Sequence, residues 1–264
     1  MSLRKIVTVT GGNGGIGYET VKALLTSQKP YHILMGSRSL EKAKFAIETL
    51  KEECPQATNT VEAIQIDLTS DESIEAAFKQ VDDTHGHIDV LVNNAGATFD
   101  IDYTAGKVSL RECFNKAYDV NVTGTNVLSY TFMPLLLKSS DPRLLFVAGL
   151  SAINQAGKQY FPTPPQPAGW PKKIGFETIG YRCSKTALNM LMLDWNHKLK
   201  ADGVKVWAVG PGMLATNLGG VPELAKAMGA QPASLGGEIL KAVIEGERDH
   251  QVGKIVVRSG IMDW

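Results

Sequence analysis

Two residues four positions apart, Tyr181 and Lys185, have side chains that could carry acid–base chemistry together. On a helix, side chains at this spacing lie on one face. A free phenol has a pKa of about 10, and a neighbouring ammonium group favours the ionised form and so lowers that pKa. The pair therefore predicts a tyrosine that exchanges a proton near neutral pH, provided that a binding site lies beside it.

A glycine-rich loop near the amino terminus indicates such a binding site. It occupies residues 10–17, after the apolar run 6–9 and before an amphipathic stretch, and so joins a predicted strand to a predicted helix. Glycines let the backbone turn sharply and approach a pyrophosphate, and the amino terminus of the helix attracts phosphate charge. We therefore predict a dinucleotide-binding loop. Its expected contacts are Gly11, Asn13, Gly14, Gly15, Ile16 and Gly17.

The end of the second predicted strand bears on the choice of dinucleotide. Ser37 and Arg38 stand about 20 residues beyond the glycines, where a fold that prefers NAD carries a carboxylate. The nearest acidic residue there is Glu41. An arginine at this place suits a 2′-phosphate, which its planar guanidinium binds, and a serine hydroxyl can donate to the same group. The sequence therefore predicts NADP(H).

Composition sets the class of protein and of partner. The 264 residues suit one α/β domain, and Lys plus Arg equals Asp plus Glu at 27 each, so no basic excess favours nucleic acid or a membrane surface. There is no signal-like segment and no apolar run of about 18 residues. Three cysteines without CxxC spacing fit a reducing compartment. We expect a cytoplasmic protein that acts on a small molecule, without nucleic-acid or membrane partners.

Two histidines, His85 and His87, alternate in a short polar segment. Imidazoles are common metal ligands, but no third ligand stands at helical or loop spacing from this pair. We predict a polar turn between a helix and a strand here, and no metal site.

Short β-branched runs alternate with longer amphipathic stretches, which is typical of repeated βαβ units. The predicted fold is a single α/β domain over 1–264, with a doubly wound, parallel, seven-stranded sheet of Rossmann type and helices on both faces. A proline-rich insertion at about 154–178 and a substrate loop at about 210–222 interrupt it. Strands are expected at 5–10, 31–36, 61–66, 88–92, 143–147, 204–209 and 253–257, and helices near 15–28, 40–53, 71–83, 109–138, 179–201 and 233–246.

With its motifs in this order, the chain resembles the short-chain dehydrogenase/reductase family over nearly its whole length. The enlarged loop before Tyr181 and the carboxyl-terminal segment ending at Trp264 resemble its NADPH-dependent, carbonyl-reductase-like branch. The matching motifs are the loop 10–17, Asp67 with Leu68, the NNAG segment with Asn94, Ala95 and Gly96, the helix asparagine Asn121, the pair Tyr181 and Lys185, and the loop with Pro211, Gly212, Met213 and Thr216.

The resemblance implies roles for these residues. Tyr181 would protonate a carbonyl oxygen while the nicotinamide delivers hydride to the carbon, and Lys185 would hold the ribose hydroxyls and tune the tyrosine. Asn121 would anchor a water that resupplies protons, or else would satisfy backbone groups within its helix. The implied activity is reduction of a ketone or aldehyde, with alcohol oxidation as the reverse reaction, in a protein that could form a homo-oligomer.

One position departs from the family pattern. The family ends its fifth strand in two serines, whereas Ala148 or Gly149 occupies the usual place here and Ser151 follows about two residues later. Ser151 could reach the substrate through an altered turn, or it could be an ordinary loop hydroxyl that leaves Tyr181 to polarise the carbonyl alone.

Two alternative functions stay open at this point. One is reduction of an imine or activated alkene, which the same residues would allow. The other is a catalytically silent, NADP-binding regulator or scaffold, because a fold alone does not establish activity. Substrate choice depends on the loops 97–108, 154–178 and 213–222.

Overall fold

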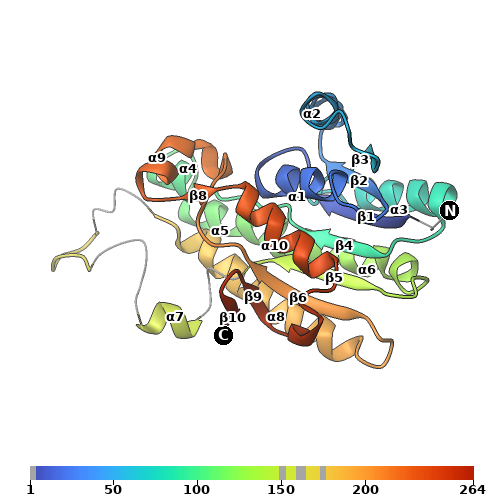
Figure 1. Ribbon diagram of the computed structural model, residues 1–264. Helices are drawn as coiled ribbons and strands as arrows, with labels where there is room; N and C mark the ends of the chain where they lie inside the picture. Colours follow the sequence, from blue (N-terminus) through green and yellow to red (C-terminus); the bar gives the residue numbers. More distant parts are fainter. Residues whose placement is uncertain (1–3, 149–152, 159–164, 173–176) are drawn as a thin grey trace.

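A central sheet organises the molecule (Figure 1). The structure is a computed structural model that describes residues 4–148, 153–158, 165–172 and 177–264. Within these ranges the strands of the central sheet are β1 (Lys5–Thr10), β2 (Tyr31–Ser37), β3 (Thr60–Gln65), β4 (Val90–Asn93), β5 (Arg143–Val147), β6 (Lys205–Gly210), β9 (Ile255–Val257) and β10 (Gly260–Met262). Their spatial order is β10-β9-β6-β5-β4-β1-β2-β3, and all neighbours are parallel except β9 and β10.

The doubly wound parallel sheet is therefore confirmed, but the described residues give it eight strands where the sequence predicts seven. The additional strand β10 has three residues, pairs antiparallel with β9 and leaves Ile261 at its centre 54% exposed. A strand this short shows too little alternation to be recognised in the sequence.

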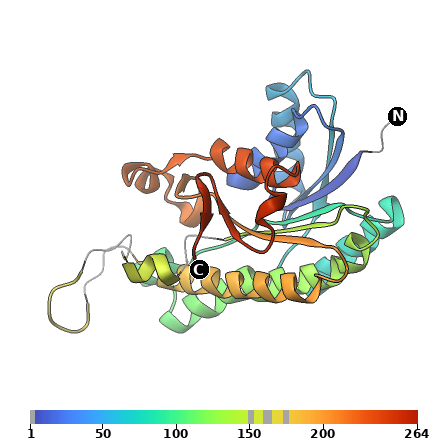
Figure 2. The ribbon, with the colours of Figure 1, turned by 60° about the horizontal axis from the view of Figure 1, so that its bottom comes forward.

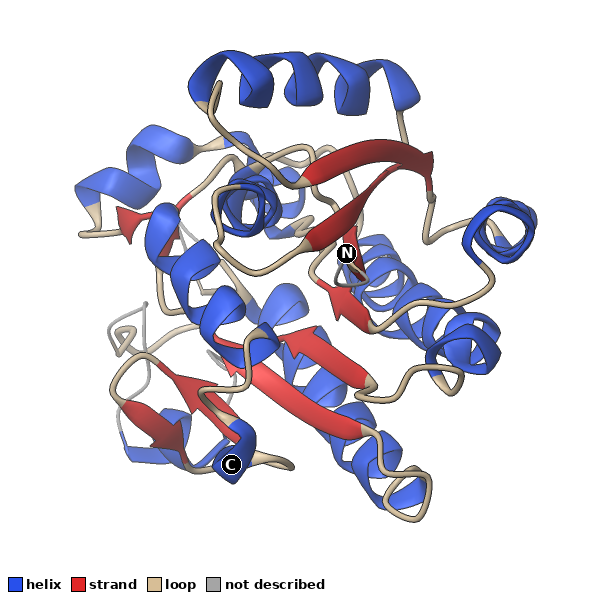
Figure 3. Cartoon of the chain, turned by 45° about the vertical axis from the view of Figure 1, so that its right-hand side comes forward, coloured by secondary structure: helices blue, strands red, loops and turns tan. Residues whose placement is uncertain are grey.

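Helices cover both faces of the sheet, as Figures 2 and 3 show. Successive strand residues point to opposite faces, so Ile6 joins one buried apolar cluster while Val7 and Val9 join the other. The first cluster packs on α3 (Asp71–His85), α6 (Thr125–Leu136) and α8 (Ile179–Lys198), and the second on α1 (Gly15–Leu25), α2 (Leu40–Glu53) and α10 (Ser234–Ile244).

The strand order creates a crevice where β1 lies next to β4. The helix α1 that follows β1 covers one face, whereas the helices that follow β4 lead to α6 on the other. At such a switch point the connections diverge, which opens a binding crevice at the carboxyl ends of the strands. Thr10 spans it, because its hydroxyl donates to the Val92 carbonyl (3.2 Å) and accepts from the Asn94 backbone N–H (3.0 Å).

The helix predicted over 109–138 is divided into three parts. These are α5 (Leu110–Tyr118), the π-helix η1 (Asp119–Gly124) and α6. Gly124 lies so close to the backbone carbonyl of Leu68 that any β-carbon would overlap it. The wider π turn and this close contact depend on a packing partner distant in sequence, which helical periodicity does not reveal.

The described residues also form small elements that the sequence did not predict. Among these residues, no helix is both long and apolar enough to cross a membrane. The additional elements are α4 (Asp100–Thr104), α7 (Ile153–Lys158), α9 (Pro222–Ala227), the 3-10 turns η2 (Leu218–Gly220) and η3 (Asp249–Gln251), and a two-stranded sheet of β7 (Leu214–Ala215) with β8 (Gln231–Pro232).

An ionic network around one buried arginine lies at the amino-terminal ends of β5 and β6. Arg143, only 3% exposed, forms ion pairs with Asp141 (3.0 Å) and Asp249 (2.6 Å), and Lys205 contacts the same two carboxylates. The Arg143 guanidinium also stands over the Trp207 ring. Burial disfavours ionisation of Asp249, but hydrogen bonds from Arg143 and Lys205 outweigh it and lower the pKa of that carboxyl. The network connects β5, β6 and η3 at the amino-terminal ends of the strands, opposite the crevice.

The packing of α10 on α1 gives a test of the fold. A β-carbon at Gly237 would overlap the Glu19 carbonyl oxygen of α1, whereas one at Gly157 in α7 would meet no atom within 4 Å. We expect Gly237→Ala to lower the free energy of unfolding by about 1–3 kcal/mol, because the two helices must separate. Gly157→Ala should leave that energy unchanged or raise it by up to about 1 kcal/mol. Urea denaturation measures both, and equal effects would contradict the packing.

Candidate active site

Two adjoining cavities open at the carboxyl ends of the strands. One, here called the long groove, has a volume of about 460 Å³ and extends from Arg38 past the glycine loop to Tyr181. The other, the apolar pocket, has a volume of about 200 Å³ and lies between the loop after β6, α9 and the first turn of α8. The residues that line both are Ile16, Val147, Tyr181, Lys185, Thr216 and Leu218.

The glycine loop forms the floor of the long groove, as the sequence predicts. Gly11 and Gly15 have φ values of +63° and +53°, which only glycine adopts without strain. A β-carbon on Gly14 would meet nothing within 4 Å, and no side chain caps α1. Gly17, by contrast, packs directly on the Gly11 carbonyl. The first backbone N–H groups of α1 thus border open space, which fits a pyrophosphate. Asn13 and Ile16 complete this part of the wall.

Cationic side chains stand at the far end of the groove. Arg38 is exposed after β2, and Lys42 follows in the first turn of α2. Among the described residues, neither side chain makes an ion pair. Ser37 is 3% exposed, and its hydroxyl accepts from the Ser39 backbone N–H. This site fits an additional phosphate. The sequence prediction of this phosphate site did not include Lys42. Its position four residues after Arg38, at the start of a predicted helix, could have indicated a second cation there.

Asp67 and Leu68 line the groove after β3. The Asp67 carboxylate accepts hydrogen bonds from the backbone N–H (3.0 Å) and hydroxyl (2.8 Å) of Thr69. The turn that these bonds form holds both residues at the wall, where the sequence places them.

The NNAG segment fastens β4 to β1 under the glycine loop. The Asn94 side-chain amide donates to the Thr10 carbonyl (2.8 Å), and the Ala95 backbone N–H donates to the Thr10 hydroxyl (2.9 Å). A β-carbon on Gly96 would lie 3.2 Å from both Asn121 Oδ1 and Lys185 Nζ. Gly96 therefore allows the lysine to approach the groove closely.

Asn121 is fully buried in η1, and backbone and side-chain groups of the protein occupy its amide. Its Nδ2 donates to the Ala97 carbonyl and to the Ser184 hydroxyl, each at 2.8 Å, and its Oδ1 accepts from the Ala97 N–H at 2.8 Å. Its side chain thus joins η1 to the loop after β4 and to α8, and its backbone partner lies outside its own helix. Its role in anchoring a water stays a prediction.

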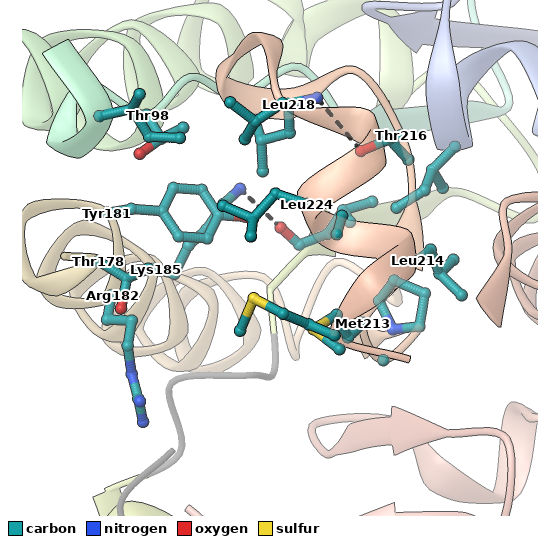
Figure 4. Close-up of a pocket in the computed structure, with 18 of the residues that line it drawn as sticks. Thr98, Thr178, Tyr181, Arg182, Lys185, Met213, Leu214, Thr216, Leu218 and Leu224 are labelled. Atoms are coloured by element: carbon teal, nitrogen blue, oxygen red, sulfur yellow. Dashed lines mark hydrogen bonds between the residues drawn. The ribbon is translucent and has the colours of Figure 1, made fainter. Parts of the chain in front are cut away.

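Tyr181 and Lys185 extend from α8 into the apolar pocket (Figure 4), and both also line the long groove. Lys185 is 4% exposed, its Nζ donates to the Val147 carbonyl (2.8 Å), and Nζ stands 5.8 Å from the centre of the Tyr181 ring. Burial lowers the pKa of Lys185 to about 8 and raises the pKa of Tyr181 to about 12. Burial therefore acts against the lowering of the tyrosine pKa that the sequence predicts, and it keeps the phenol protonated at neutral pH.

Asp100 holds the amino terminus of α8 and was missed in the sequence. Its side chain is 1% exposed; Oδ1 accepts from the Gly180 N–H (2.8 Å) and Oδ2 from the Tyr181 N–H (2.9 Å). The N-cap residue Thr178 makes no side-chain capping bond itself. A carboxylate at a helix amino terminus satisfies free N–H groups and complements the helix dipole. Nothing local in the sequence marks Asp100, because its partners lie 80 residues away.

Most of the residues that line the apolar pocket are apolar, although the charged residues Glu177 and Arg182 also line it. Thr98 and Ile101 come from the loop 97–108, and the other walls come from α8 and from the chain between β6 and β8. The predicted substrate loop thus borders the pocket, and the wall continues through α9 beyond that loop. Residues of this chain segment in the wall are Pro211, Gly212, Met213, Leu214, Thr216, Leu218, Val221, Leu224, Ala225 and Met228.

The residues before α8 are only partly described. Ser151 and Gly149 lie outside the described residues, whereas Ala148 lines the apolar pocket. Trp170, in the proline-rich insertion, is 88% exposed and does not line either cavity.

The role of Asp100 gives a prediction about stability. We expect Asp100→Ala to lower the free energy of unfolding by about 2–4 kcal/mol, because two buried N–H groups lose a charged acceptor. Asp100→Asn should cost about half as much, since one amide oxygen can still accept. The matched control is Asp102→Ala, which removes only an exposed pair with Lys107 and should cost less than about 1 kcal/mol. Urea unfolding that failed to separate Asp100→Ala from Asp102→Ala would refute the assignment.

Comparisons with known proteins agree with this geometry. A family model described as short chain dehydrogenase matches residues 5–160. The short-chain dehydrogenase/reductase tropE of Talaromyces stipitatus is 46% identical over 265 residues, which cover 98% of this chain and 97% of that protein.

Two solved structures share the fold. NADPH-bound carbonyl reductase from chicken fatty liver has a TM-score of 0.78 at 22% identity and full coverage of both chains. The 3-oxoacyl-(acyl-carrier protein) reductase of Brucella melitensis in complex with NAD has a TM-score of 0.75 at 22% identity, covering 97% of this chain and 96% of that one. The extent of the family match and the identity to tropE show that the chain belongs to the short-chain dehydrogenase/reductase family of oxidoreductases, whose members bind a nicotinamide cofactor.

Proposed function

We propose that the protein is an NADPH-dependent carbonyl reductase that converts an apolar ketone or aldehyde to the alcohol, and that catalyses the reverse oxidation. The observation that carries this proposal is the position of Tyr181 and Lys185 in the wall shared by the long groove and the apolar pocket. A cofactor in the groove and a substrate in the pocket would meet at the phenol. The reduced nicotinamide supplies the hydride when the cofactor is bound.

The residues of the groove fit each part of the cofactor. The amino terminus of α1 would bind the pyrophosphate, and Arg38, Lys42 and the Ser37 hydroxyl would bind a 2′-phosphate. Asp67 and Leu68 would border the adenine. The NNAG segment, Lys185 and the loop from Pro211 to Thr216 would hold the nicotinamide riboside. NADPH-bound carbonyl reductase has the same fold, although the NAD complex of the Brucella reductase does also, so the preference for NADPH rests on the cations at the far end.

Tyr181 would donate its proton to the carbonyl oxygen of the substrate. Because burial keeps the phenol protonated, the tyrosine is in the form that reduction needs. Once the proton has left, the phenolate would face the Lys185 ammonium, which the Val147 carbonyl holds in place. Desolvation strengthens the attraction between these opposite charges, so the pair stabilises the charge that develops during the reaction.

The lining of the apolar pocket favours a hydrophobic substrate. Leu214, Leu218 and Leu224 supply branched apolar surface, and Met213 and Met228 supply flexible side chains that adapt to irregular shapes.

We propose that Ser151 donates a second hydrogen bond to the substrate carbonyl.

Replacing the proposed acid tests the reaction. We expect Tyr181→Phe to lower kcat for NADPH oxidation with a ketone by about 10²–10⁴, because the ring stays while the proton donor is lost, and to change NADPH affinity little. Ser151→Ala should lower kcat by about 10² if its hydroxyl stabilises the developing oxyanion. The control is Tyr130→Phe, at a tyrosine that is 75% exposed on α6. A Tyr181→Phe enzyme with full turnover would exclude this mechanism. An inactive wild type that binds NADPH would instead favour a silent binding protein.

The cofactor preference has its own test. We expect Arg38→Asp to weaken NADPH binding by about 10–100-fold or more and NADH binding much less, because a carboxylate replaces a partner of the 2′-phosphate. We expect Lys42→Ala to weaken NADPH binding as well, but by a smaller factor. Arg258→Asp is the control, since Arg258 is exposed at the turn between β9 and β10, away from the groove. Calorimetric titration gives the NADPH and NADH affinities of the wild type and of each variant, and a ratio of the two that Arg38→Asp left unchanged would rule out the 2′-phosphate site.

A further inference from the structure

Three side chains with metal-ligating atoms converge at the β3 edge of the sheet, apart from both cavities. They are His32 at the start of β2, Glu62 in β3 and His85 at the end of α3, and one ligand atom from each lies within 4.8 Å of the others. Glu62 Oε1 is 2.8 Å from His85 Nε2 and 3.5 Å from His32 Nε2. The two imidazole rings are 5.0 Å apart between their centroids.

The parallel pairing of β2 with β3 produces this cluster. His32 pairs with Thr60 and Leu34 with Glu62, so Thr60 and Glu62 lie on one face of β3, beside His32. The last residue of α3 then places His85 over the same face. The sequence prediction considered His85 with His87 and found no third ligand. His32 and Glu62 come from strands distant in sequence, which spacing around His85 does not reveal, while His87 lies beside Asp89 (3.6 Å).

Hydrogen bonds on the far side of His32 orient its ring toward the cluster. Its Nδ1 lies 2.7 Å from the Thr60 hydroxyl oxygen, and Arg4 donates to the same oxygen at 3.1 Å. Metal-binding histidines are typically fixed in this way through the ring nitrogen that does not bind the metal. When Nδ1 carries the proton and donates to Thr60, Nε2 presents a lone pair to the cluster.

In this tautomer, the lone pair of Nε2 has no donor among the described residues. His32 Nε2 is buried and has no hydrogen-bond partner among the described residues. A carboxylate oxygen of Glu62 faces it at 3.5 Å. Two electron pairs that face each other at this distance repel unless a proton or a metal cation lies between them. His85 Nε2 makes a hydrogen bond with the same Glu62 oxygen (2.8 Å) and would release its proton to bind a divalent cation.

We propose that His32, Glu62 and His85 bind one Zn²⁺ ion and leave its fourth position to water. Two imidazoles and one carboxylate are a ligand set that zinc accepts in tetrahedral geometry, with neighbouring ligand atoms about 3.3–3.5 Å apart. The Glu62 oxygen lies 2.8 Å and 3.5 Å from the two imidazole nitrogens, and all three atoms lie within 4.8 Å of one another. The side chains of His32, Glu62 and His85 are 22%, 45% and 18% exposed, so the ion can enter from solvent. The ion joins the edge strand β3 to α3 and takes no part in the reaction proposed above.

The test uses the full-length protein without a histidine tag, after chelator treatment and removal of the chelator. Titration with Zn²⁺ by calorimetry should show one site, and Co²⁺ should give the visible absorption of a tetrahedral complex. Zn²⁺ should also raise the Tm of the wild type. We expect His32→Gln and His85→Gln each to weaken Zn²⁺ binding at least tenfold and to abolish the Tm increase.

The matched control is His87→Gln, which removes a neighbouring imidazole outside the cluster and should bind Zn²⁺ as the wild type does. Glu62→Gln replaces either histidine variant if circular dichroism shows that the variant is unfolded. A wild type without a Zn²⁺ site would overturn the proposal, and so would a site that survives His85→Gln or that is lost in His87→Gln. None of these measurements depends on reductase activity.

Discussion

The carboxylate of Asp100 accepts hydrogen bonds from the backbone N–H groups of Gly180 and Tyr181, and the position of α8 depends on this contact. The bonds fix the helix along its axis at the turn that carries the phenol. A second contact, from Lys185 Nζ to the Val147 carbonyl, fixes it against the end of β5 one turn later. Asn121 adds a third connection through the Ser184 hydroxyl. Side chains on loops would vary more, whereas these anchors hold the tyrosine and lysine on a rigid element.

Burial at this position has an energetic cost that explains the arrangement of the pair. Removing an ammonium group from water disfavours its charged form, which is why the pKa of Lys185 falls to about 8. The Val147 carbonyl offsets part of that cost with one hydrogen bond. A phenolate on Tyr181 would offset more of it, so the environment that keeps the tyrosine neutral at rest becomes favourable to its ionised form next to the lysine. In the reaction proposed above, the best partner of the lysine charge would therefore form only when the phenol loses its proton.

Local sequence carried enough information to predict the glycine loop, the Tyr181 and Lys185 pair, Arg38 and the parallel sheet. Each of these depends on spacing along a single element or on the alternation of short elements. Asp100 could not be found, because its function depends on backbone groups 80 residues away. The π-helix η1 was missed for a related reason, since its close contact is with the Leu68 carbonyl on another segment.

The His32 cluster and the strand β10 show the same limit of sequence analysis. Strand register brings His32 beside Glu62, and register cannot be known before the pairing partners are known. The strand β10 has only three residues and depends on β9 as its template. Spacing along one element is therefore visible in the sequence, whereas contacts between elements require the fold.

The ionic network around Arg143 and the loops that shape the apolar pocket lie far apart in the fold. It joins β5, β6 and η3 at one edge of the sheet, while the loops that shape the apolar pocket lie at the other edge. Substitutions at Ile101, Leu224 or Met228 can reshape the pocket without contact with these charges. During divergence, a lineage with this architecture can therefore exchange one substrate for another while the strands keep their pairing, so that specificity changes on an unchanged fold.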